Sequence, residues 1–155
     1  MNDLRNLNAG GMIALILCAV LLLPMMACGP LNVVSAAVGA LEAAAQALPN
    51  SVLSAADKAL AASYYTSVNT ALSCVTAELA TSDTGFVRDT VIGACLTTAL
   101  ASFPNLPPTV QAIAAAVNAA LAAIKGWYST GSTAKVDAGS LRKIEAKRAA
   151  IRIIH

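Results

Sequence analysis

The sequence predicts an all-α protein, an up-down bundle of about four alanine-rich helices followed by a basic C-terminal helix. Alanine, the strongest helix former, occupies 35 of the 155 positions. Apolar residues recur at intervals of three and four along most of the chain, whereas β-branched runs are too short to indicate strands. Because the connections between the helical stretches are short, neighbouring helices are expected to run antiparallel.

Prolines, glycines and polar turns set the expected boundaries of the helices. The first helix should end at Pro49, and the fourth should begin at 107–108, since proline suits the first turn of a helix. Gly126 is expected to end the fourth helix, so that Trp127 and Tyr128 open a loop. The expected helices cover 31–48, 51–80, 84–102, 108–125 and 140–154.

The second of these helices shows the spacing of a single buried stripe. In the second helix the apolar positions are Leu53, Ala56, Leu60, Tyr64, Val68, Leu72, Val75 and Leu79. In the third helix they are Phe86, Val87, Val91, Ile92, Cys95, Leu96, Leu100 and Phe103. Aromatic residues make up only 4% of the chain, so we expect leucine, valine and isoleucine to fill a core in which alanine lets the helices approach closely.

The turn TSDTG at 81–85 joins the second and third helices, with Asp83 suited to cap the third and Gly85 supplying backbone freedom. Cys74 and Cys95 lie at nearly equal distances along the chain from this turn. Two antiparallel helices would bring them level, which predicts a disulfide between Cys74 and Cys95. The alternative is a pair of reduced cysteines acting as small core residues.

Residues 1–27 have the features of an export signal. The stretch 12–27 carries no charge and as a helix would span roughly 24 Å, short of the roughly 30 Å hydrocarbon core of a bilayer. It is long enough for the apolar region of a signal peptide. Pro24 bends or ends this helix, and Gly29 with Pro30 interrupts the chain again.

This apolar run closes with Met25, Met26, Ala27 and Cys28. Here the chain resembles a bacterial or phage-encoded lipoprotein, whose leader ends in a four-residue lipobox with a required final cysteine. Ala27 fits the pattern, whereas Met25 and Met26 stand where the class prefers leucine and a small residue. The resemblance covers only the leader. It implies cleavage before Cys28, a diacylglycerol thioether on the Cys28 sulfur, and an acyl chain such as palmitate on the new amino terminus.

Two other interpretations of the leader remain open. In one, the leader is an uncleaved signal anchor and Cys28 is incidental. In the other, an ordinary signal peptidase cuts near Ala27 and Gly29, although Pro30 should obstruct that cut. Export would in either case deliver Cys74 and Cys95 to an oxidising compartment.

The C-terminal segment is electrostatically distinct. Residues 28–134 carry three basic and five acidic side chains, whereas residues 135–155 carry six basic and two acidic ones. We therefore divide the chain into a signal peptide (1–27), a helical bundle domain (28–134) and a basic C-terminal helix (135–155). The candidate residues for contact with anionic lipid or an acidic partner are Arg142, Lys143, Lys147, Arg148 and Arg152. The alternative is a solvated helix that packs Leu141, Ile144, Ile151 and Ile154 on the bundle.

Patterns that would indicate an enzyme are missing from the sequence. The single histidine, His155, is the last residue, and no phosphate-binding loop, HExxH, GxSxG or EF-hand pattern occurs. We expect no catalytic residues, no metal site, no cofactor and no nucleic acid partner.

The function that the sequence predicts is that of a non-enzymatic, lipid-anchored envelope protein acting by contact with a membrane or with another envelope protein. It would face the periplasm or the cell surface, at the outer membrane in a Gram-negative host. Two alternatives remain open. One is a membrane-inserting, pore-forming or holin-like protein. The other is a carrier that holds an apolar ligand between helices.

Overall fold

The computed structural model describes residues 29–81, 83–101, 103–129 and 135–153. Within these ranges the chain forms five α-helices and no strand, which confirms the all-α prediction. The helices are α2 (Pro30–Ala47), α3 (Ala55–Leu79), α4 (Gly85–Leu100), α5 (Pro108–Tyr128) and α6 (Ala138–Ala149). The predicted signal peptide and Cys28 lie outside the described residues, as do Ile154 and His155.

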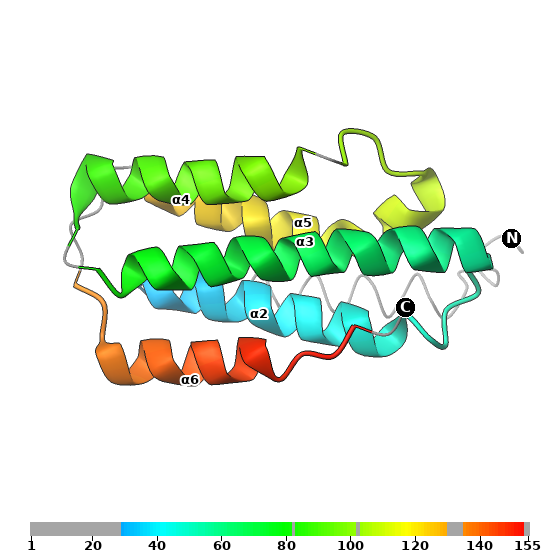
Figure 1. Cartoon of the computed structure of the whole chain (residues 1–155), viewed down its shortest axis with the longest axis horizontal. Helices are drawn as coiled ribbons and strands as arrows, with labels where there is room; N and C mark the ends of the chain where they lie inside the picture. Colours follow the sequence, from blue (N-terminus) through cyan, green and yellow to red (C-terminus); the bar gives the residue numbers. More distant parts are fainter. Residues whose placement is uncertain (1–28, 82, 102, 130–134, 154–155) are drawn as a thin grey trace, which may run out of the picture.

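Successive helices run in opposite directions, so the predicted up-down arrangement is present (Figure 1). The closest pairs are α3 with α4 and α2 with α5, and α4 also packs on α5. The C-terminal helix α6 lies along α2 and α3, on the side of the bundle away from α4. Consequently α2, α4 and α6 begin at one end of the molecule, where α3 and α5 end.

The core contains few large side chains, and alanine fills much of the space between the helices. Its largest fully buried residues are Tyr65, Tyr128, Leu41, Leu72, Ile92 and Ile124. Ala37 and Ala40 on α2 and Ala61 and Ala62 on α3 are also at most 2% exposed. Small side chains at these positions let helix backbones approach closely, as the composition predicts.

The predicted end of the fourth helix at Gly126 is wrong, because α5 continues through Tyr128. The Tyr128 side chain is only 1% exposed, and the guanidinium of Arg88 lies 5.6 Å from its ring centre. Burying this aromatic ring outweighs the roughly 1 kcal/mol by which glycine disfavours a helix interior.

The start of the second helix also differs from the prediction. Ser54 caps α3, with its hydroxyl accepting a hydrogen bond from the Asp57 N–H at 3.1 Å. This cap satisfies one of the free N–H groups of the first turn, so the helix begins at Ala55 instead of at residue 51.

The last helix is shorter than predicted. Asp137 caps α6 by accepting a hydrogen bond from the Ser140 N–H at 2.6 Å. The helix ends at Ala149, and beyond it Ile151 and Ile153 lie partly buried against the core in a non-helical segment.

Asp83 does not cap α4, contrary to the prediction. The capping position belongs to Thr84, which makes no side-chain cap hydrogen bond, while the Asp83 N–H donates to the Thr81 hydroxyl at 3.2 Å. The expectation for Gly85 is confirmed, since its φ of 62° lies in the left-handed region that favours glycine.

Candidate functional site

The candidate site is the end of the bundle where α2 begins, which we call the Gly29 end. Gly29 precedes α2 directly, and beside it an open cavity of about 420 Å³ lies between α2 and the start of α6. Its lining includes Asn32 and Ser35 from α2 and Lys135, Asp137 and Lys143 from the α6 side. This end therefore combines the start of the bundle with part of the basic segment.

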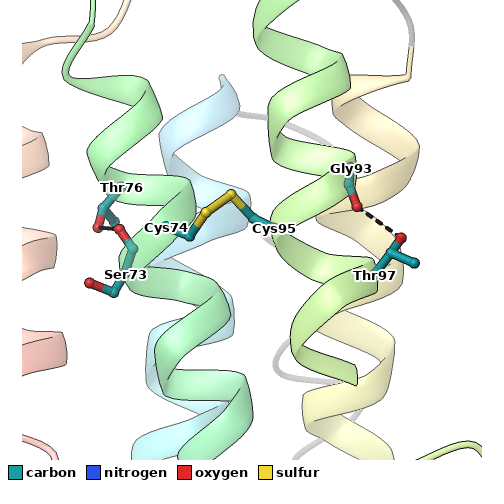
Figure 2. The surroundings of a disulfide bond; sticks show 6 residues. All are labelled: Ser73, Cys74, Thr76, Gly93, Cys95 and Thr97. Carbon is teal, nitrogen blue, oxygen red and sulfur yellow. Dashed lines mark hydrogen bonds between the residues drawn. A yellow bond between two sulfur atoms is a disulfide. The ribbon is translucent and has the colours of Figure 1, made fainter. Parts of the chain in front are cut away.

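The disulfide predicted between Cys74 and Cys95 is present, joining α3 to α4 (Figure 2). The two Cα atoms lie 5.7 Å apart, and the two cysteines are 21 positions apart in the sequence. Cys95 is only 6% exposed, whereas Cys74 lies at the surface. The bond links α3 and α4 covalently.

Two of the five predicted contact residues hold α6 against the bundle. The Lys147 ammonium forms an ion pair with Glu42 of α2 at 3.0 Å. Arg148 pairs with Glu145 and donates a hydrogen bond to the Asn69 amide oxygen of α3 at 3.3 Å. These two basic side chains have a structural role within the chain.

Glu145 is the centre of this α3–α6 contact. The Thr76 hydroxyl donates to its carboxylate at 2.6 Å, and Arg148 donates to the same group. The hydrogen bond from Arg148 first, and then that from Thr76, lowers the pKa of Glu145. The same pairing raises the pKa of Arg148, so both groups are held charged.

The apolar side of α6 faces the bundle, as the alternative interpretation of the C-terminal segment predicts. Leu141 and Ile144 are each 8% exposed. The other three predicted contact residues are exposed but do not form one patch. Arg142 and Lys143 line cavities at the Gly29 end, whereas Arg152 follows α6 at the opposite end, in a hollow that includes Glu42 and Pro49.

A buried arginine at the Gly29 end has no counterpart in the sequence prediction. Arg88 of α4 is 2% exposed and lies over the ring of Tyr128 from α5, a cation–π contact. Burial raises the pKa of Tyr128 to about 12, although the charge of Arg88 acts in the opposite direction. This contact fixes the start of α4 against the end of α5.

Apolar side chains at the start of α4 lie at the surface. Phe86 is 83% exposed, Val87 is 59% exposed and Val91 is 37% exposed, whereas Ile92 is fully buried. The helix packs mainly on α3 and α5, so its apolar circumference is wider than the face it buries. The sequence could have indicated this exposure, because Phe86 and Ile92 do not share one side of a helix. The apolar residues of α4 therefore cover a wider face than one buried contact requires.

A second hollow, of about 400 Å³, lies between α4 and α5. Leu96, Leu100 and Leu121 contribute apolar surface to it, and Lys125 stands at its rim. This is where the carrier hypothesis would place an apolar ligand.

Among the described residues, no group of three or more His, Cys, Asp or Glu side chains is placed to hold a metal ion. Within the same ranges, α5 is the helix long and apolar enough to cross a membrane, judged by length and composition alone. No protein-family model matches the chain, and searches of curated proteins and of solved structures found no similar protein.

Proposed function

We propose that this protein is a non-enzymatic envelope lipoprotein, anchored through lipid on Cys28 and acting by contact with a membrane or an envelope protein. The proposal rests mainly on the position at which the lipobox-like residues 25–28 end. Cys28 is separated from the first described helix only by Gly29. Cleavage before Cys28 would remove the apolar leader and leave all five described helices intact.

The disulfide supports the proposed export. Cys74 lies at the surface, where cytosolic reductants would reach the bond. Disulfides of this kind persist in oxidising compartments such as the periplasm or the cell surface. The disulfide between α3 and α4 is therefore consistent with a protein that folds after translocation.

Three acidic groups of the described bundle have structural roles, which supports a non-enzymatic function. Glu42 and Glu145 are in ion pairs with basic residues of α6, and Asp137 caps that helix. These carboxylates hold helices in place, and they come from separate positions on the surface instead of converging in one pocket.

The intact mass of membrane-extracted protein tests the anchor. We expect the wild-type mass to correspond to a chain beginning at Cys28 with a diacylglyceryl group and an added acyl chain. The Cys28→Ser variant should retain the leader and carry no lipid. An unmodified full-length wild-type mass would refute the lipoprotein proposal.

The membrane-inserting alternative rests on one observation, the length and hydropathy of α5. In the bundle, however, the larger apolar residues of this helix face inward, including Val110, Val117, Leu121 and Ile124. Four of its exposed positions are alanine, and Gln111, Asn118 and Lys125 are exposed as well, which gives a weak drive for insertion.

Producing residues 29–155 alone separates the two functions. For an anchored bundle we expect a protein that stays in solution without detergent and shows a helical circular dichroism spectrum. Recovery only in detergent, or release of dye from vesicles by the purified domain, would favour insertion.

A further inference from the structure

Exposed apolar residues are concentrated at the Gly29 end of the bundle. Five large apolar side chains of the described ranges are exposed, and four of them are Phe86, Val87, Val91 and Trp127. All four lie on the half of α4 or α5 nearest the Gly29 end. The fifth, Val52, lies in the α2–α3 connection at the opposite end.

The direction of α4 aims two of these side chains outward from the end of the bundle. The Cα–Cβ bonds of an α-helix tilt toward its N-terminus. Phe86 and Val87 occupy the first turn of α4, which begins at the Gly29 end. Their side chains therefore lean beyond the end of the helix, and their exposed fractions of 83% and 59% show that no described neighbour covers them.

The tether between the proposed lipid anchor and the bundle is short. Consecutive Cα atoms are about 3.8 Å apart, so the Cα of Pro30, where α2 begins, lies within about 8 Å of the Cα of Cys28. The headgroup layer of one leaflet is about 5–8 Å thick. A lipidated Cys28 would thus hold the Gly29 end at the headgroups, with no linker to lift the bundle away.

We propose that the Gly29 end is a membrane-contact surface, with Phe86 and Val87 inserted at the boundary between headgroups and acyl chains and Trp127 at headgroup level. The inference rests on the proposed lipidation of Cys28, and its occupant is a phospholipid bilayer. Tryptophan favours this interfacial depth, and apolar side chains of surface-bound proteins are buried to a similar depth. The bundle would then stand end-on, with Val52 away from the membrane.

Charge has a secondary role in this contact. Lys135, Arg142 and Lys143 are exposed at the Gly29 end and can approach lipid phosphates. Asp83 and Asp137 are exposed at the same end, and they offset part of that attraction. The apolar side chains consequently determine the contact, and it should form on zwitterionic as well as anionic lipid.

The single tryptophan of the chain makes the contact measurable. The membrane-extracted lipidated protein would be reconstituted into phosphatidylcholine vesicles with plain or brominated acyl chains, because bromine quenches tryptophan fluorescence only at short range. We expect the fluorescence of Trp127 to be lower in the brominated vesicles than in the plain ones. A matched reporter at the opposite end, Val52→Trp combined with Trp127→Phe, should remain unquenched.

The roles of Phe86 and Val87 are tested in the same assay with Phe86→Asp and Val87→Asp combined. Both positions are exposed, so helical content and lipidation should be retained while quenching of Trp127 falls sharply. Val52→Asp is the matched control and should leave the quenching unchanged. Unaltered quenching in the double variant would overturn the assignment of these two residues.

Intact mass measured on each reconstituted sample separates failure of this inference from failure of the proposed function. Lipid on Cys28 with unquenched Trp127 would overturn the membrane-contact surface and leave the lipoprotein intact. Equal quenching of the two reporters would also overturn it, because the bundle would then lie on its side. A mass without lipid would refute the proposed function and this inference together.

Discussion

Leu41→Ala should lower the free energy of unfolding by about 3–5 kcal/mol, a large effect for a single truncation in the bundle. Leu41 is fully buried on α2, the helix that contacts α3, α5 and α6. Removing its branched side chain leaves a cavity that the surrounding core can fill only in part. Urea unfolding of residues 29–155, followed by circular dichroism, measures the loss.

Leu31→Ala provides the matched control, because it makes the same chemical change on the same helix. Leu31 is only partly buried, in the first turn of α2, where its neighbours and solvent can fill the space. We expect it to lose less than half as much stability as Leu41→Ala. Comparable losses at the two positions would contradict the full burial of Leu41 in the core.

The helices themselves were predictable because their signals are local. Alanine content, apolar spacing and the proline breaks identify five helices in the correct order, and these features act within one or two turns of chain. The Cys74–Cys95 pair was predictable for a related reason. A short turn between antiparallel helices fixes which residues of the two helices lie opposite each other. Counting residues outward from the turn was therefore sufficient to pair the two cysteines.

The predicted helix boundaries were wrong where a contact with a distant residue outweighed the local sequence signal. Gly126 is a poor helix residue, but α5 continues through it because Tyr128 packs against Arg88 of α4. No pattern near Gly126 reveals that partner. Likewise, Asp83 has the right chemistry for a cap but stands one residue before the position that α4 uses.

The candidate site was only partly predictable, because exposure depends on how helices pack. The sequence marks Phe86 and Ile92 equally as apolar, yet one lies at the surface and the other in the core. Which side of α4 is buried depends on α3 and α5. In the basic segment, too, the internal roles of Lys147 and Arg148 follow from Glu42 and Glu145 being placed opposite them.

Removal of the disulfide should cost about 3 kcal/mol, the second large effect, because the bond closes a loop of 21 positions and restricts the unfolded chain. The variant combines Cys74→Ser with Cys95→Ala. Serine suits the exposed position, while alanine avoids burying a hydroxyl where Cys95 is 6% exposed. Urea unfolding of residues 29–155 with this pair of substitutions measures the loss.

Wild-type protein unfolded in the presence of a reductant is the control, since it loses the bond without changing side-chain volume. If the bond acts on the unfolded state, the variant and the reduced wild type should lose similar stability. Both should also show a steeper dependence on urea, because the unfolded chain without the bond exposes more surface. Free thiols at both Cys74 and Cys95 in a non-reducing peptide map of exported protein would refute the disulfide. If the variant and the reduced wild type lose equal stability but their dependence on urea is unchanged, the bond would instead act on the native packing of α3 on α4.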